Sequence, residues 1–216
     1  MKQEEACEAI KELIFSNRLV PGQKIIYRDL EEKLGMSKTP IINGLIKLEE
    51  EGLMVSKKNR GFYVKEENIE EARQIFEVRE KLEEIAIDFA LKNFRDCDLE
   101  VLEQKMVSYK NYSPQIYDRK RLALDTDFHM QIAEMGGNQY FGELIGRFYE
   151  NIYFRLNLIC LSPRIEQFGK EHEQLFNAIK AKNAKEAKRI VRFHTRAGKK
   201  LVFEKKYQCQ KLSVAV

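Results

Sequence analysis

The sequence predicts a mainly α-helical protein, with an N-terminal winged helix-turn-helix domain over residues 1–66 and an all-helical bundle over residues 67–216. Two observations lead to this fold class. Two helical patterns flank a tight turn at Gly35-Met36, and two apolar runs then enclose a basic loop that ends at Gly61. From Asn68 onward, apolar residues recur at helical spacing, in segments separated by short breakers.

The first domain is expected to contain three helices and a two-stranded ribbon. Its predicted elements are a helix over residues 4–17, a short strand at Ile25-Ile26 that pairs with the ribbon, helices over residues 27–34 and 37–51, and ribbon strands over residues 53–56 and 62–64. Ser37 is a good N-cap, with Pro40 still inside the first turn of its helix. Gly44 weakens that helix by ~1 kcal/mol relative to alanine, which close packing would explain.

The N-terminus of the helix that starts at Ser37 is predicted to read DNA. Its free N–H groups and positive dipole end suit phosphate oxygens and base edges in a major groove, and Ser37-Lys38-Thr39 adds polar side chains there. The ribbon loop carries Lys57, Lys58 and Arg60 beside Gly61. Such a loop suits a basic wing that lies on the DNA backbone or in a minor groove.

Composition sets looser bounds on location and partner. No apolar run approaches the ~20 residues that a membrane span needs, and no signal peptide opens the chain, so we expect a cytoplasmic protein without a membrane partner. The four cysteines form no Cys-x-x-Cys pair, which argues against a thiolate metal site or a disulfide framework. A net charge of +4 permits a nucleic-acid partner without demanding one.

The second domain is predicted to consist of six helices. They span residues 69–93, 97–112, 115–135, 139–161, 164–182 and 184–206. Short breakers such as Ser113-Pro114, Ser162-Pro163 and Asn183 separate them. Because connections this short join antiparallel neighbours, we expect a compact bundle.

The informative residues of this bundle are its histidines, because the chain has only three. His129, His172 and His194 each occupy a position of an apolar helical stripe, and Asp125 lies one turn before His129 on the same face. His172 and His194 are each eleven residues from Asn183, where the last two helices join. At ~1.5 Å rise per residue, both imidazoles then lie ~16 Å along facing helices and can meet.

Asp125, His129, His172 and His194 together indicate a divalent metal site. A single histidine of this kind is more often a core residue with a satisfied hydrogen bond. An ionised Asp125 on an apolar stripe, however, costs several kcal/mol unless a positive charge compensates it. Nitrogen and oxygen ligands without thiolate suit zinc, our first choice, and also nickel, manganese or iron.

Four motifs follow one another in the first sixty-five residues. They are Pro21-Gly22, Leu34-Gly35-Met36-Ser37-Lys38-Thr39-Pro40, a Leu-x-x-Leu-x-x-x-Gly-Leu run from Leu45 to Leu53, and Gly61-Phe62-Tyr63-Val64. In this order they resemble the GntR family of bacterial transcription regulators. The second domain, with its Asp-x-x-x-His pair and two later histidines, looks like the FCD ligand-sensing domain of the FadR-like branch, in the shorter six-helix form. The two signatures cover nearly the whole chain.

The resemblance implies a homodimer that binds an inverted-repeat operator in double-stranded DNA and responds to a small organic acid bound at or beside the metal. Release of a repressor by its effector is the commoner outcome in the family. The family's metal ligands match Asp125, His129, His172 and His194. Its DNA contacts carry over onto Arg28, Ser37, Lys38, Thr39, Arg60 and Gly61. Where many members have an arginine in the reading helix this chain has Ile42, and Asn43 is expected to take over the polar contact.

Four residues are candidates for contacting the effector. Arg79 falls in a Val-Arg-x-x-Leu-Glu pattern of the family and suits a carboxylate clamp, although an i,i+4 pair with Glu83 explains it equally well. Asn138 is a helix N-cap or a residue of the pocket wall. Tyr153 and Arg155 are also assigned to the effector cavity, although helical periodicity alone does not determine whether they face it.

Two alternatives to an effector-sensing metal site stay open. The metal could be purely structural in a DNA-binding protein, or three histidines and an aspartate could activate water in a mononuclear metalloenzyme. The enzyme is disfavoured because no general base accompanies the ligands: Asp127, two residues from Asp125 on a helix, points elsewhere. We therefore predict a regulator that is not an enzyme. The sequence predicts neither the effector nor the operator.

Overall fold

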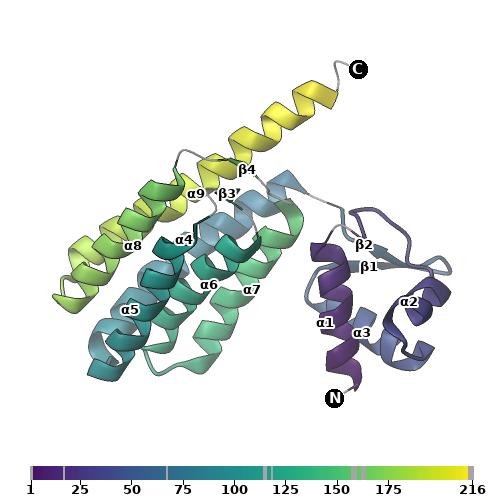
Figure 1. Cartoon of the computed structure of the whole chain (residues 1–216), viewed down its shortest axis with the longest axis horizontal. Helices are drawn as coiled ribbons and strands as arrows, with labels where there is room; N and C mark the ends of the chain where they lie inside the picture. Colours follow the sequence, from purple (N-terminus) through teal and green to yellow (C-terminus); the bar gives the residue numbers. More distant parts are fainter. Residues whose placement is uncertain are drawn as a thin grey trace. The chain divides into compact units, whose positions relative to one another are not determined.

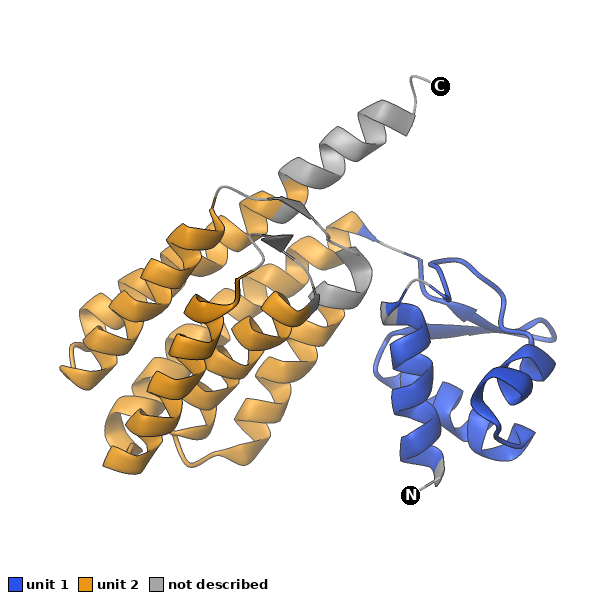
Figure 2. Cartoon of the chain, viewed as in Figure 1, with its two compact units in different colours: residues 1–68 blue, residues 69–216 orange. Residues whose placement is uncertain are grey.

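The computed structural model describes residues 2–16, 18–66, 68–113, 116–117, 119–156, 160–161 and 164–213, without the side chains of residues 2, 15, 116–117, 119, 152–156, 160–161, 202 and 204–213. The chain divides into two compact units, residues 1–68 and residues 69–216 (Figure 2).

The first unit is a winged helix-turn-helix, which confirms the predicted fold class. Its elements are α1 (Lys2–Phe15), α2 (Tyr27–Leu34), α3 (Lys38–Glu50), β1 (Met54–Lys57) and β2 (Gly61–Val64), as labelled in Figure 1. Helix α3 packs on α1 through Gly44, where a β-carbon would lie 3.0 Å from the backbone nitrogen of Cys7 and 3.2 Å from Cβ of Ala6. Close packing therefore explains why a residue that weakens a helix occupies this position.

The turn between α2 and α3 depends on Gly35. This residue has a left-handed φ of 64°, and its N–H donates to the carbonyl of Glu31 over 2.9 Å. A side chain would be strained at such a φ, so glycine ends α2 here. Ser37 then stands at the N-cap of α3 in an extended conformation, but its hydroxyl makes no capping hydrogen bond.

The strand predicted at Ile25-Ile26 is displaced towards the N-terminus. The described structure has a bridge between Lys24 and Tyr63, flanked by hydrogen bonds from Ile25 N to Phe62 O (2.9 Å) and from Val64 N to Gln23 O (2.9 Å). Ile26 is exposed and occupies the N-cap position of α2. The prediction was wrong at Ile26 because two adjacent isoleucines do not show which of them pairs and which precedes a helix.

The second unit is an all-helical bundle with one very short ribbon (Figure 1). Its elements are α4 (Ile69–Asn93), α5 (Asp96–Asn111), β3 (Ile116–Tyr117), α6 (Arg119–Glu134), α7 (Gln139–Leu156), β4 (Cys160–Leu161), α8 (Ile165–Lys180) and α9 (Ala184–Ser213). All six predicted helices are present. None of the helices, over the residues that the structure describes, has the length and hydropathy to cross a membrane.

Two of the predicted helices are too long. The helix expected over residues 115–135 begins at Arg119, and the one expected over residues 139–161 ends at Leu156. The difference is the antiparallel β3–β4 pair, which joins Ile116 to Leu161 and Tyr117 to Cys160. A two-residue pairing between such distant segments leaves no periodic pattern in the sequence. The other helix ends differ by one or two residues, except that α9 continues to Ser213.

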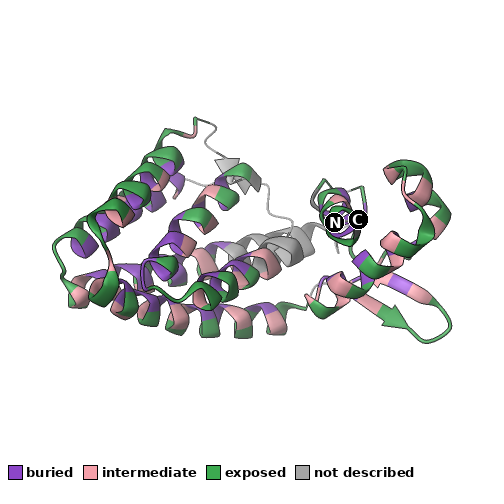
Figure 3. Cartoon of the chain, turned by 90° about the horizontal axis from the view of Figure 1, so that it is seen from below, coloured by how far each residue is buried: buried purple, intermediate pink, exposed green. Residues whose placement is uncertain are grey.

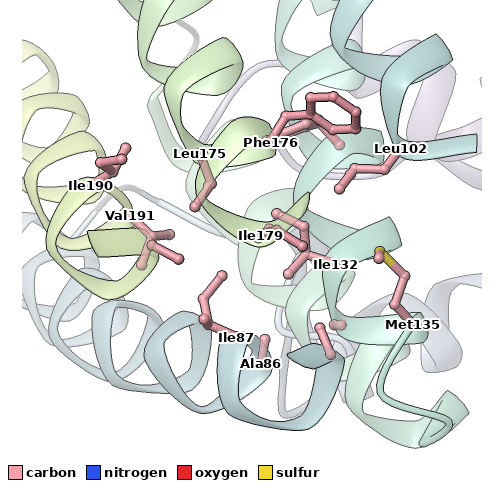
Figure 4. Close-up of a cluster of buried hydrophobic side chains, with 14 of the residues drawn as sticks. Ala86, Ile87, Leu102, Ile132, Met135, Leu175, Phe176, Ile179, Ile190 and Val191 are labelled. Carbon is pink, nitrogen blue, oxygen red and sulfur yellow. The ribbon is translucent and has the colours of Figure 1, made fainter. Parts of the chain in front are cut away.

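Buried residues of the bundle lie mainly on the helix faces that are turned towards its centre (Figure 3). Figure 4 shows the larger apolar cluster, in which Ile87 of α4, Ile132 of α6, Leu175 and Ile179 of α8 and Val191 of α9 point towards one another. A smaller cluster contains Tyr109, Phe168, Ala197 and Leu201. Along α8 and α9 the two clusters are separated by one turn, and that turn carries His172 and His194. A polar layer therefore lies between two apolar layers of the same core.

Helices α4 and α9 are joined by a ladder of four ion pairs. The pairs are Asp88–Lys188 (2.6 Å), Glu84–Arg192 (2.5 Å), Glu80–Arg196 (2.8 Å) and Glu77–Lys199 (3.0 Å). The residue numbers fall on one helix as they rise on the other, so the two helices are antiparallel. Such partly exposed pairs each contribute about 0–1 kcal/mol, and their regular spacing fixes the register of α9 on α4.

Candidate metal centre and nucleic-acid interface

Asp125, His129, His172 and His194 come together inside the bundle. One potential ligand atom from each residue lies within 4.8 Å of the others, and all four residues are buried. Asp125 and His129 share a face of α6 because they are one turn apart, while His172 and His194 come from α8 and α9. The ring centroids of His172 and His194 are 4.7 Å apart, as their equal distance from the α8–α9 turn led us to expect.

Asp125 lies at the centre of this cluster. Its Oδ1 is 3.1 Å from Nε2 of His172 and 3.5 Å from Nε2 of His194. The ring of His129 is 5.3 Å from that of His172 and 5.0 Å from that of His194, measured between centroids. Two imidazoles thus lie beside one carboxylate oxygen, and the third imidazole lies beside those two rings.

The charges of the cluster are strongly coupled. Burial by itself raises the pKa of Asp125, but its contacts with His172 and His194 outweigh burial and hold that pKa well below the usual value. Burial lowers the pKa of His172 to about 4. Burial also acts to lower the pKa of His194, but Asp125 and Glu171 raise it to about 9. Without a metal, the cluster at neutral pH therefore holds an ionised Asp125, a neutral His172 and a protonated His194.

The donor set fits a divalent cation. Nε2 of His129 is buried and has no hydrogen-bond partner in the described part of the chain. An orphaned buried imidazole nitrogen costs free energy unless a ligand satisfies it. Three imidazoles and one carboxylate are ligands that zinc, nickel, manganese and iron accept, so these four residues could hold such an ion.

Two buried glutamates, neither of which was predicted as a site residue, contact this cluster. Glu83 Oε2 lies 2.7 Å from Nδ1 of His129, and Glu171 Oε2 accepts a hydrogen bond from Nδ1 of His194 over 2.9 Å. The sequence did contain a pattern that could have identified both glutamates. Each glutamate lies on the inward stripe of its helix, as Asp125 does: Phe76, Arg79 and Glu83 on α4, and Phe168, Glu171 and Leu175 on α8.

Arg79 is buried beside the cluster. It forms the i,i+4 ion pair with Glu83 that was one of its two predicted roles. Its Nε donates to Oε1 of Glu83 over 2.5 Å, and its Nη2 donates to the hydroxyl of Tyr149. The guanidinium also stacks on the ring of Tyr149, with Cζ 3.6 Å from the centroid. Tyr149 was likewise missed, since an aromatic residue on an apolar stripe does not stand out in a sequence.

The remaining effector candidates are not brought to the cluster by any described contact. Asn138 is exposed just before α7, eleven residues from Tyr149 in the chain, which is about 16 Å along a helix. Its carbonyl accepts the N–H of Phe141 over 3.0 Å, in keeping with a role at the helix end. The side chains of Tyr153 and Arg155 lie outside the described residues. Asp127, the base considered for an enzyme, is exposed.

In the first unit, the predicted DNA contacts lie on the surface. Exposed residues of α2, of α3 and of its N-cap are Arg28, Ser37, Lys38, Thr39 and Asn43. Exposed residues at the end of β1 and in the β1–β2 turn are Lys57, Lys58 and Arg60. Gly61, with a φ of 86°, starts β2 after this turn. Ile42 is half-buried on the same helix. Asn43 is thus the polar side chain available where the arginine is missing.

Tyr27, which was not predicted as a site residue, links the two parts of this surface. Lys38 Nζ lies 5.2 Å from the centroid of its ring, and a β-carbon on Gly61 would lie 3.7 Å from its hydroxyl. The N-terminus of α3 and the base of the wing therefore lie beside the same tyrosine. A helix N-terminus and a basic turn on one side of a small domain can contact one stretch of DNA together.

Residues 2–64 match the gntR family of bacterial regulatory proteins, and residues 74–197 match the FCD domain. The chain belongs to the GntR family and carries an FCD domain. It is accordingly a transcription regulator of the GntR type. Proteins of this family bind DNA operators, and an FCD domain implies a small-molecule effector.

Relatives of this GntR-type regulator extend over most of its length. The uncharacterized HTH-type transcriptional regulator YdhC of Bacillus subtilis is 25% identical over 187 residues, covering 86% of this chain and 84% of YdhC. The Nta operon transcriptional regulator of Aminobacter aminovorans is 26% identical, covering 71% of this chain and 70% of the relative. The solved structure of E. coli McbR/YncC has the same fold, with a TM-score of 0.80, 18% identity, and coverage of 95% of this chain and 99% of that chain.

Proposed function

We propose that this protein is a homodimeric repressor whose operator affinity is controlled by a small carboxylate effector, bound beside a divalent metal ion in the FCD domain. The metal would be held by Asp125, His129, His172 and His194. The observation that carries this proposal is the buried convergence of these four side chains within 4.8 Å. A polar layer of this kind is expensive to enclose in an apolar core unless a ligand compensates its charge and its orphaned nitrogen.

The residues around the cluster support an anionic effector. When bound, the cation would supply positive charge and further coordination positions for a carboxylate. Arg79 would add a guanidinium from α4, buried and always charged, whose hydrogen bonds to Glu83 and Tyr149 fix its direction. Burial excludes water from both groups, which strengthens their interaction with an anion.

The DNA-binding half of the proposal assigns Lys38, Thr39 and Asn43 of α3 to the major groove. Ser37 and Arg28 would contact phosphates, and Lys57, Lys58, Arg60 and Gly61 would form the wing contact. The exposure of these side chains and the position of Tyr27 between α3 and the wing support this assignment.

A homodimer is supported by an apolar stripe on the outer face of α4. Val78, Ile85 and Phe89 are 48%, 43% and 38% exposed, and their spacing places them on one side of the helix. Phe89 contacts Phe141 of α7, and Leu144 of α7 is also exposed. Two copies joined through such a face would present two recognition helices to an inverted-repeat operator.

The proposal is tested on protein purified without added metal. Elemental analysis and native mass spectrometry should show one divalent ion per chain and any retained acid. Operator binding is then titrated with candidate carboxylic acids in gel-shift experiments, before and after treatment with a chelator. We expect an acid that weakens operator binding only while the metal is present.

The same experiment separates sensing from a structural metal. If chelation unfolds the protein while the metal-loaded protein never responds to an acid, the metal is structural. If the chelated protein stays folded and loses its response, the metal takes part in sensing. Operator affinity that no acid changes would contradict the effector.

A further inference from the structure

Two of the proposed metal ligands are each held by a buried glutamate. Nδ1 of His129 lies 2.7 Å from Glu83, and Nδ1 of His194 donates to Glu171 over 2.9 Å. The glutamate side chains are 3% and 2% exposed, so water does not compete for these contacts. In both cases it is Nδ1, and not Nε2, that faces the glutamate.

Each glutamate is held in turn by an arginine. Arg79 donates to Glu83 over 2.5 Å from Nε, and Arg164 donates to Glu171 over 3.0 Å from Nη2. Each carboxylate is thus paired with a guanidinium, which stabilises its ionised form. An ionised carboxylate only accepts hydrogen bonds, so the neighbouring Nδ1 must carry the proton.

This arrangement leaves Nε2 of both histidines for the centre of the cluster. Nε2 of His194 lies 3.5 Å from Oδ1 of Asp125. Nε2 of His129 is buried without a hydrogen-bond partner in the part of the chain that the structure describes. The third ring is held differently: His172 is stacked on Phe128 at 4.4 Å and meets the edge of Tyr109 at 4.5 Å, measured between centroids.

We propose that Glu83 and Glu171 are positioning residues, which orient His129 and His194 so that Nε2 of each binds the metal. Arg79 and Arg164 keep the two glutamates in place, and aromatic packing does the same for His172. The inference rests on the proposed metal site and extends it to residues that do not touch the ion. It also gives Arg79 a second role, because an anion that engages Arg79 acts on the residue that holds Glu83 against His129. Effector affinity and metal affinity should therefore be linked through the contacts from Arg79 to Glu83 and from Glu83 to His129.

The Arg79–Glu83 pair and the Arg164–Glu171 pair differ in their exposure to solvent. The side chains of Arg79 and Glu83 are 6% and 3% exposed, whereas that of Arg164 is 37% exposed. Loss of Glu83 would leave a buried arginine unpaired, while loss of Glu171 lets Arg164 turn towards water. Glu171 is therefore the safer position for a variant, and Glu83 the one with the larger effect.

The first test needs no variant. The full chain is labelled with nitrogen-15 at histidine, loaded with zinc, and examined by long-range proton–nitrogen NMR, which distinguishes the metal-bound nitrogen from the protonated one. We expect Nε2 of His129 and His194 to be bound and Nδ1 to be protonated. Coordination through Nδ1 at either residue would overturn the positioning role and leave the metal site intact. Absence of bound zinc would instead overturn the proposed function.

The second test measures zinc affinity by competition with a chelator. Glu171→Gln and Glu83→Gln should each weaken zinc binding by about 10- to 100-fold, the usual cost of losing an outer partner of a ligand. Glu166→Gln is the matched control on α8, because its side chain is 74% exposed and its ion pair is with Lys170, one turn along the same helix. Circular dichroism of the metal-free variants checks that they fold. A folded Glu171→Gln variant with the affinity of the control would contradict the inference.

Discussion

The two units of this chain use polar side chains in opposite ways. In the first unit, the residues assigned to DNA are exposed and the core is built from apolar side chains such as Ile10, Leu45 and Leu48. In the second unit, the residues assigned to the metal are all buried, between two apolar clusters. The difference follows the size of the ligand. A DNA duplex can be contacted only at a surface, whereas an ion can be enclosed.

This difference has an energetic consequence for each unit. Exposed lysines and serines cost little to maintain and contribute little to stability, so they are free to change with the operator. Buried charges are stable only as a complete set, because removal of one partner leaves another uncompensated. A substitution at the metal cluster should thus alter binding and stability together, and a substitution at the DNA surface should alter binding alone.

The largest expected effect is the loss of a ligand. His172→Ala should weaken zinc binding by more than the roughly 10- to 100-fold that loss of an outer partner costs, because a direct bond to the ion is removed. Zinc affinity is measured by chelator competition, and occupancy by native mass spectrometry. Glu173→Gln, the next residue on the helix, is 44% exposed and serves as the control. Equal affinity in the two variants would refute His172 as a ligand.

The second effect concerns pH and appears only in metal-free protein. The pKa of His194 is raised from 6.5 to about 9, so its stabilisation is complete below pH 6.5 and is lost as the pH rises through 9. The free energy of unfolding in urea should therefore fall over that range, by on the order of 1–3 kcal/mol.

The variant His194→Gln tests whether this pH dependence arises in the second unit. His194→Gln should remove the dependence between pH 6.5 and pH 9, since the first unit contains no histidine. A slope that persists in this variant would show that another group causes it. Below pH 6.5 the sign reverses: burial lowers the pKa of His172 in the folded state to about 4, so the unfolded chain takes up this proton first and stability falls as the pH falls.

A smaller effect is expected at the packing contact of the first unit. Gly44→Ala places a β-carbon 3.0 Å from Cys7 N, which should cost about 1–3 kcal/mol of overpacking against a gain of ~1 kcal/mol in helix propensity. Urea unfolding should show a net loss of up to about 2 kcal/mol. Asn43→Ala, on the exposed face of the same helix, should not destabilise the unit. A more stable Gly44→Ala variant would mean that α1 shifts to accommodate the methyl group.

The smallest effect belongs to the DNA surface. Lys38→Ala should weaken operator binding and reduce the slope of log affinity against log salt by about one, if Lys38 neutralises one phosphate. Fluorescence anisotropy at several salt concentrations measures this slope. Lys185→Ala, an exposed lysine of α9, is the control and should leave it unchanged. Neither variant should change the free energy of unfolding, in contrast to His172→Ala.

Much of the fold was predictable because helical periodicity depends only on residues that are close together in the sequence. It placed the winged helix, the six bundle helices, and the faces that carry Asp125, His129, His172 and His194. The meeting of His172 and His194 followed from their equal distance to Asn183, whose side chain accepts the N–H of Glu186 over 3.1 Å at the start of α9. These features depend only on spacing along one helix or across one short turn.

Other features were decided by the tertiary structure. Glu83 meets His129, Tyr149 meets Arg79, and β3 pairs with β4 only because helices distant in the sequence pack side by side. Tyr27 lies beside both Lys38 and Gly61 because α2 packs against α3 and its first residue also meets the start of β2. A periodic pattern tells which face of a helix is buried and how far along it a residue lies. Which neighbour that face meets is set by how the helices pack, so the outer partners of the proposed metal ligands are found only in the folded bundle.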